Sequence, residues 1–145
     1  MTPKQLEAVW DAHMAAEFEQ KDVEAALATM TEDAYVIHVP VNSGGRGRNE
    51  VRRFYRDVFI PSWPKDKRIT SLHRFVGEGH VVEEVRISLT HSVPMEWFLP
   101  GVPPTHKKVE VDFVVVIEFC GDKIAAERIY WDHATVLRQV GLLKG

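Results

Sequence analysis

The sequence has few of the features that mark several large classes of protein. Its single cysteine, Cys120, cannot form an internal disulfide, which is typical of a protein kept in the reducing cytoplasm. The formal net charge of -3 argues against a nucleic-acid-binding protein, which usually has a basic patch. No apolar run is long enough to cross a bilayer, and the N-terminus lacks the pattern of a signal peptide. We therefore expect a cytoplasmic protein that binds neither nucleic acid nor membrane.

Sequence motifs of metal and nucleophile chemistry are also missing. The histidines form no HExxH or HxH pattern and have no cysteine partner, and no serine lies in a GxSxG motif. The glycine-rich stretch at residues 44–48, GGRGR, has neither the Walker A nor the dinucleotide-binding spacing, and we interpret it as a tight turn. We therefore expect no metal and no cofactor. The alternative is a metal site built from distant residues such as His38, His91 and Asp132.

Length and patterning predict one domain over residues 1–145. The chain is long enough to bury a core, and its 45% of hydrophobic and 27% of charged residues are typical of a globular protein. We expect two helices before residue 30, a strand at residues 35–40, a third helix capped by Asn49, strands from residue 68 and a terminal helix. Helices packed on one face of a curved, mostly antiparallel sheet give an α+β fold with a cavity between the layers.

The first helix has one histidine on its apolar stripe. Thr2 and Gln5 have the spacing of a capping box, and Leu6, Trp10 and His13 then recur on one helical face. The plainer interpretation of His13 is a histidine whose hydrogen bonds are satisfied in the core or at its rim. The alternative is that His13 points into a pocket.

A hairpin near the C-terminus is the most informative stretch. The turn at residues 121–122 joins an apolar run, residues 109–119, to the strand at residues 124–132. Because side chains alternate between faces, simple folding back about this turn predicts polar groups over an apolar floor, an arrangement typical of a small-molecule pocket. The polar groups are Arg128, Tyr130 and Asp132, and the floor is Val111, Phe113, Val115, Ile117 and Phe119.

Asp132 has two interpretations of equal weight. It directly precedes a predicted helix, and as the N-cap it would have its charge stabilised and its pKa lowered. As a general acid at neutral pH, it would need a pKa raised by apolar surroundings. Arg128 likewise either contacts a ligand or only pairs with Asp132 and keeps it charged.

Other regions supply further candidate pocket residues. His38 is a candidate second proton carrier because a histidine titrates near neutral pH, and the alternative is a histidine on the outer face of the sheet. Residues 95–105, MEWFLPGVPPT, place large apolar side chains in a proline-rich loop. We expect this loop to cover the pocket as a lid or, alternatively, to contact a partner subunit. The expected ligand contacts are Phe113, Val115, Trp97, Trp63, Tyr35 and His91.

The order of the elements and the sequence of residues 121–143, GDKIAAERIYWDHATVLRQVGLL, resemble the SnoaL-like, polyketide cyclase-like family of the nuclear transport factor 2-like superfamily. The shared features are the glycine-containing hairpin turn, a strand that reaches Asp132, and a helix that ends in Gln139-Val140-Gly141. The resemblance implies a cone-shaped α+β fold in which three N-terminal helices pack on the curved sheet and a short helix follows it. It also implies a deep apolar pocket, a homodimer through the open face of the sheet, and, from the polyketide cyclases, an acid–base role for Asp132.

These residues favour cofactor-free acid–base chemistry on a small hydrophobic carbonyl compound. Asp132 would give or take a proton, His38 would carry a second proton, and Tyr130 or Arg128 would stabilise an enolate-like oxyanion. A cyclase, an isomerase or a dehydratase fits this chemistry. The alternative is a non-catalytic homodimer that binds a small molecule and uses Asp132 only as a helix cap.

Overall fold

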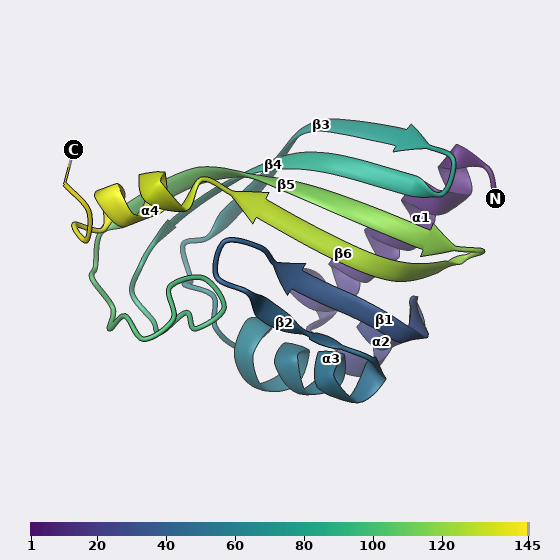
Figure 1. The fold of residues 1–145 in the computed structure, drawn as a ribbon, viewed down its shortest axis with the longest axis horizontal. Coiled ribbons are helices and arrows are strands. Elements are labelled where there is room, and N and C mark those ends of the chain that lie inside the picture. Colours follow the sequence, from purple (N-terminus) through teal and green to yellow (C-terminus); the bar gives the residue numbers. More distant parts are fainter. Residues whose placement is uncertain (145) are drawn as a thin grey trace.

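The computed structural model describes residues 1–144, which form a helical layer on one sheet (Figure 1). The helical layer contains α1 (Pro3–Ala15), the π-helical turn η1 (Ala16–Gln20), α2 (Val23–Ala28), α3 (Arg48–Phe54) and the π-helical turn η2 (Tyr55–Phe59). The strands are β1 (Met30–His38), β2 (Ser43–Arg46), β3 (Arg68–Gly77), β4 (His80–Thr90), β5 (Lys108–Cys120) and β6 (Lys123–Trp131), and α4 (His133–Gln139) follows them. Within residues 1–144, no helix combines the length and the apolarity needed to cross a bilayer.

The six strands lie in the order β2-β1-β6-β5-β4-β3. β1 and β6 pair in parallel, whereas the other neighbouring strands are antiparallel. The predicted α+β fold, with helices on one face of a curved, mostly antiparallel sheet and a short helix after it, is confirmed.

The first helix begins as its sequence predicts. The hydroxyl of Thr2 accepts from the backbone N–H of Gln5, and the Gln5 side chain accepts from the N–H of Thr2. α1 passes directly into η1, and α3 passes into η2 in the same way. π-Helical turns are frequent at functional sites, so the presence of η1 and η2 suggests a functional site between the helices and the sheet.

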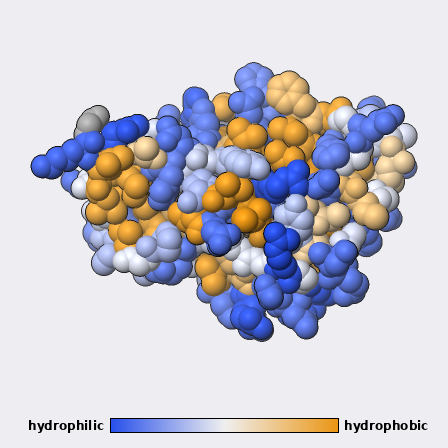
Figure 2. Space-filling model, in the orientation of Figure 1, coloured by the Kyte–Doolittle hydropathy of each residue, from blue (hydrophilic) through white to orange (hydrophobic). Residues whose placement is uncertain are grey.

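The two faces of the sheet carry different side chains. The inner face, toward α1, holds buried apolar residues such as Val85 and Phe113. The outer face mixes charged and apolar residues, and Figure 2 shows apolar side chains across its middle, with hydrophilic ones around and between them. Its apolar residues include the half-buried Val114 and Val116. The helices therefore leave the outer face uncovered.

The register of the β5–β6 hairpin differs from the prediction by one residue. Phe119 pairs with Ile124 as expected, but Glu118 pairs with Ala126, so Ala125 is an extra residue on β6. The backbone N–H of Phe119 donates to the carbonyl of Gly79, and that of Ile124 donates to the carbonyl of Thr29. Two backbone N–H groups near the tip of the hairpin are therefore hydrogen-bonded to other segments of the chain. Because side chains alternate, this bulge moves every later β6 side chain to the face opposite to the predicted one.

The aromatic loop at residues 91–107 is covered by the chain itself. Met95, Trp97, Phe98 and Leu99 are each at most 1% exposed. The rings of Phe98 and Trp131 have centroids 5.2 Å apart, and the ring of Phe113 on β5 lies 6.0 Å from that of Phe98. The loop therefore closes one end of the core without a partner subunit.

Candidate functional site

A pocket lies between the helical layer and the inner face of the sheet. It has a volume of about 50 Å³, which is room for a few water molecules. Met14, Phe18, Trp63 and Ile69 are half-buried and lie at its rim. The other lining residues are Trp10, Glu17, Val36, His38, Tyr55, Phe59, Glu83, Val85, Ile87, Phe113, Val115, Glu127 and Ile129.

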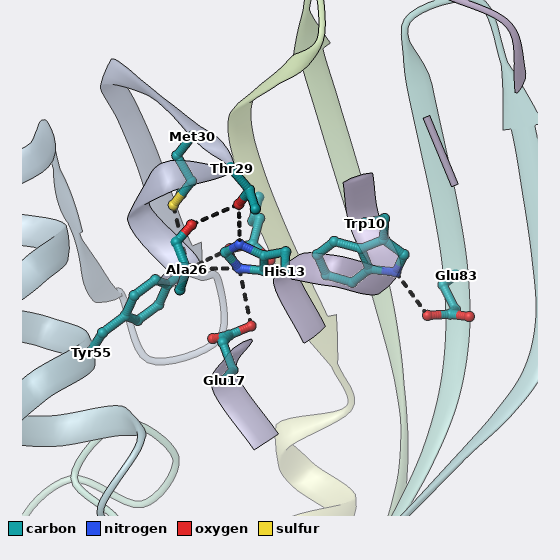
Figure 3. Close-up of polar contacts among 9 residues, drawn as sticks. Trp10, His13, Glu17, Ala26, Thr29, Met30, Tyr55 and Glu83 are labelled. Atoms are coloured by element: carbon teal, nitrogen blue, oxygen red, sulfur yellow. Dashed lines mark hydrogen bonds and ion pairs between the residues drawn. The ribbon is translucent and has the colours of Figure 1, made fainter. Parts of the chain in front are cut away.

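Four polar side chains from four elements meet at this pocket. Nε2 of His13 lies 3.0 Å from Oε1 of Glu17 and 3.3 Å from Oε2 of Glu127. The hydroxyl of Tyr55 donates to the same Glu127 oxygen over 2.7 Å. Figure 3 shows His13 between Glu17, Thr29 and the ring of Tyr55. All four are at most 5% exposed, so the fold holds a polar cluster inside an apolar core.

The direction of one hydrogen bond fixes the orientation of His13. The hydroxyl of Thr29 donates to the carbonyl of Ala26 over 2.7 Å, because a carbonyl can only accept. That hydroxyl therefore accepts from Nδ1–H of His13, 2.8 Å away. Nε2 is left to face the carboxylates of Glu17 and Glu127.

The two glutamates of the cluster have pKa values shifted in opposite directions. Burial raises the pKa of Glu17 above its ordinary 4.5, although the charge of His13 acts against this. Burial is the largest single effect on Glu127 and acts in the same direction, but the charge of His13 and the hydrogen bonds from His13 and Tyr55 together outweigh it and lower the pKa of Glu127. Burial alone lowers the pKa of His13, but Glu127 and Glu17 raise it well above 6.5. At neutral pH, His13 is therefore charged, Glu127 is ionised, and Glu17 keeps its proton to higher pH than an ordinary glutamate.

His38 faces the same pocket from β1 and stays neutral. Its Nδ1 donates to the carbonyl of Ser43 over 3.2 Å. Burial lowers the pKa of His38 to about 4, although the Ser43 carbonyl and the charge of Glu127 act against this. At neutral pH, His38 is therefore an uncharged imidazole with its proton on Nδ1.

Glu83 is a third carboxylate in the wall, and it is tied to the scaffold. It accepts from the indole of Trp10 over 3.0 Å, from Ser71 over 2.9 Å and from Arg74 over 2.8 Å. Burial raises the pKa of Glu83, but these hydrogen bonds outweigh burial and the pKa falls below 4.5. Arg74 also lies 2.9 Å from Asp11 of α1. Glu83 therefore fastens α1 to the sheet.

The His13 cluster is also where metal-binding atoms come together within the described residues. The donor atoms of His13, Glu17 and Glu127 all lie within 4.8 Å of one another. In this arrangement the charged imidazole lies against both carboxylates and supplies the positive charge between them. We therefore interpret the cluster as an ion-paired network.

Four of the predicted site residues line the pocket: His38, Trp63, Phe113 and Val115. Trp97 lies directly behind them, with its ring centroid 4.8 Å from that of Trp63 and 5.2 Å from that of His38. Trp97 therefore supports the wall of the pocket.

Arg128, Tyr130 and Tyr35 lie on the outer face of the sheet. Arg128 donates to the hydroxyl of Tyr35 over 2.9 Å and to Glu118 over 2.7 Å, and Tyr130 is 40% exposed. The predicted pocket positions of Arg128 and Tyr130 are wrong because the bulge at Ala125 reverses the faces of β6. Tyr35 is on this side because it alternates with the inward-facing His38 on β1.

Asp132 and His91 also lie away from the pocket. Asp132 is exposed and caps α4: it accepts from the backbone N–H of Thr135 over 3.3 Å and from the Thr135 hydroxyl over 2.8 Å. These hydrogen bonds lower the pKa of Asp132, so the structure matches the helix-cap interpretation. His91 is buried at the start of the aromatic loop, where its Nδ1 accepts from the backbone N–H of Thr105 over 3.2 Å.

Sequence reasoning missed Glu17, Tyr55 and Glu127. A signal was present for Glu17, which lies four residues after His13 and so shares its helical face. The predicted register places Arg128 inside, so alternation leaves the neighbouring Glu127 on the outer face, which is the same one-residue error. Tyr55 meets Glu127 72 residues later in the chain, and no local pattern around Tyr55 indicates that partner.

Comparisons with known proteins agree with this fold. A model of the SnoaL-like domain family matches residues 10–127. No curated protein matches the chain.

Several solved structures are similar to this chain. A proposed SnoaL-like polyketide cyclase from Jannaschia sp. CCS1 has 18% identity and a TM-score of 0.74, with 97% of this chain and 94% of that chain covered. A protein with a ketosteroid isomerase-like fold from Catenulispora acidiphila, in complex with trimethylamine, has 16% identity and a TM-score of 0.66, with 93% of each chain covered. SalBIII, an epoxide hydrolase/cyclase-like enzyme in pyran ring formation in polyether salinomycin, has 20% identity and a TM-score of 0.62, with 89% of this chain and 91% of that chain covered. At these identities the similarity shows a shared fold.

Proposed function

The chain belongs to the SnoaL-like domain family, and we propose that it is a cofactor-free acid–base enzyme that transfers a proton on a small, largely apolar carbonyl compound. The observation that carries this proposal is Glu17, a carboxyl group that lines the pocket and is 5% exposed. Its raised pKa brings it closer to the pH at which a general acid–base group works well. Glu17 thereby takes the role that the sequence suggested for Asp132.

The residues around Glu17 support both of its protonation states. With its proton, the carboxyl group donates to a carbonyl oxygen. Without it, the carboxylate is stabilised by the charged His13, whose Nε2 is 3.0 Å away, and it accepts the proton from the carbon next to the carbonyl group. Glu127 keeps His13 charged, and Tyr55 keeps Glu127 ionised, so neither has to move during the reaction.

The apolar lining suits the carbon skeleton of a small carbonyl compound. Removal of a proton next to a carbonyl group is a step shared by isomerisation, dehydration and aldol-type cyclisation. Similar structures named for cyclase and isomerase-like folds support this class of chemistry and leave the substrate open.

Exchange of protons next to a carbonyl group with deuterium tests the proposal directly. Small neutral ketones such as butanone and cyclopentanone are incubated with the protein in D₂O, and loss of the proton signal is followed by NMR. We expect exchange faster than in buffer, and a fall of at least about 100-fold in Glu17→Gln, which keeps the shape but cannot transfer the proton. Glu19→Gln, an exposed residue of the same turn, is the matched control and should exchange at the wild-type rate.

Equal exchange by wild type and Glu17→Gln would contradict the role of Glu17. Saturable binding of the ketones without any exchange would favour the second candidate, a non-catalytic binding protein. That candidate also uses the pocket, but it needs no group with a shifted pKa.

We further propose that the protein works as a cytoplasmic homodimer joined through the outer face of the sheet. The half-buried Val114 and Val116 and the exposed Tyr130 give this face an apolar centre. The one cysteine, Cys120, is free and exposed, which fits a reducing compartment.

A further inference from the structure

His38 presents an unused hydrogen-bond acceptor to the pocket. The carbonyl of Ser43 can only accept, so the proton of the neutral imidazole lies on Nδ1 and Nε2 carries the lone pair. Within residues 1–144, Nε2 makes no hydrogen bond, although His38 is only 2% exposed and lines the pocket. Nε2 is not among the fully buried polar atoms that lack a partner, so it is accessible from the pocket, where a hydrogen-bond donor can meet it.

Within the described residues, no donor of the pocket wall makes a hydrogen bond to Nε2 of His38. The hydroxyl proton of Tyr55 is used by Glu127, and the indole N–H of Trp10 is used by Glu83. The indole N–H of Trp63 is unpaired, but its nitrogen is buried and makes no hydrogen bond to His38. The donor that meets His38 must therefore come from a bound molecule.

The wall offers one proton to an acceptor of that molecule. Glu83 and Glu127 are ionised and can only accept, whereas the carboxyl group of Glu17 can donate while it holds its proton. A molecule that satisfies this wall therefore brings one acceptor for Glu17 and one donor for His38. A carbonyl oxygen is the acceptor that the proposed chemistry already requires.

We propose that the substrate is a neutral hydroxycarbonyl compound, whose carbonyl oxygen accepts from Glu17 and whose hydroxyl group donates to Nε2 of His38. This inference rests on the proposed function, because it takes Glu17 as the group that meets the carbonyl. It adds a specificity-determining role for His38. A plain ketone leaves Nε2 of His38 unpaired and binds more weakly for that reason.

Two probes that differ only in the hydroxyl group test the assignment. Hydroxyacetone and butanone have the same number of heavy atoms, with a hydroxyl group in one where the other has a methyl group. Dissociation constants at neutral pH are measured by ligand-observed NMR in ordinary water. We expect wild type to bind hydroxyacetone roughly tenfold more tightly, although an apolar pocket alone would favour butanone.

Two variants of His38 locate the effect. His38→Phe keeps a ring and removes the acceptor, and it should bind hydroxyacetone no more tightly than butanone. His38→Gln keeps an acceptor oxygen and should retain part of the preference. Binding of butanone by each variant reports that the pocket is still folded.

Equal or weaker binding of hydroxyacetone by wild type overturns the inference, and so does a preference that survives in His38→Phe. Failure to bind either probe also overturns it, because wild type then has no site for such a molecule. Failure of the proposed function gives a different result: hydroxyacetone is preferred at equilibrium, but neither probe exchanges its protons in D₂O.

Discussion

The hydroxyl of Tyr55 donates to Oε2 of Glu127 over 2.7 Å and joins residues that are 72 positions apart in the sequence. Tyr55 comes from η2 and Glu127 from β6, so this bond fastens the helical layer to the sheet beside the pocket. Both side chains are at most 4% exposed, and water cannot readily replace the bond when it is lost.

Removal of this hydroxyl should weaken both the fold and the site. In Tyr55→Phe, Glu127 loses a donor in a buried place, which should cost about 1–3 kcal/mol of unfolding free energy in urea. The pKa of Glu127 should rise, because this hydrogen bond is one of the contributions that lower it. Proton exchange on butanone should slow as well.

Ser92→Ala is the control for this loss. Ser92 is exposed in the loop after β4, and its hydroxyl makes no hydrogen bond within the described residues, so its removal should leave the unfolding free energy within about 0.5 kcal/mol of wild type. A similar loss in both variants would mean that the Tyr55–Glu127 bond is no stronger than the contact with water.

The sequence predicted the architecture because several separate stretches of the chain each specify one helix, strand or turn. Alternation in β4 and β5, the capping box at Thr2 and the turn at residues 121–122 each define an element locally, and all of them are present. The sequence did not predict the bulge at Ala125 in β6. Ile124, next to the extra residue Ala125, donates to Thr29, almost a hundred residues earlier, and no local pattern contains that contact.

The site was harder to predict than the fold for the same reason. His38 and Phe113 were recognised because a strand position fixes the face of a side chain. Arg128 and Tyr130 were misplaced because one extra residue reverses that face after Ala125. The cluster of His13 with Glu127 depends on the packing of α1 against β6, which hydrophobic periodicity does not specify.

His38 should make the stability of the protein depend on pH. In the unfolded chain it takes up a proton near pH 6.5, whereas in the folded protein it stays neutral down to about pH 4. Its stabilising contribution is therefore complete above pH 6.5 and is lost as the pH falls through about 4. The difference of about 2.5 pH units corresponds to about 3 kcal/mol.

A variant isolates this contribution from that of the other acidic groups. His38→Gln does not titrate, so between pH 7 and pH 4 it should lose up to about 3 kcal/mol less unfolding free energy than wild type. Urea unfolding at each pH measures the difference. Parallel curves for the two proteins would mean that His38 has an ordinary pKa in the folded state.

Asp132→Ala separates the structural role of this residue from a catalytic one. Loss of the side chain leaves the backbone N–H of Thr135 without its cap, and the melting temperature should fall by about 2–4 °C. Proton exchange should stay at the wild-type rate, because Asp132 is exposed and lies away from the pocket. A fall of more than about tenfold in exchange by the folded variant would restore Asp132 as an acid–base residue.

A charge in the middle of the outer face should split the proposed homodimer. Val114 pairs with Tyr130 across β5 and β6, and Val116 lies two residues further along β5, so a lysine at position 114 must be desolvated to enter an interface there. In sedimentation velocity, wild type should have twice the mass of the 16.6 kDa chain, and Val114→Lys should have the mass of one chain. Leu143→Lys, beyond α4, adds the same charge at another exposed apolar residue and should remain dimeric. Wild type that sediments as a single chain at micromolar concentration would instead mean that this apolar face is exposed to solvent in the working protein.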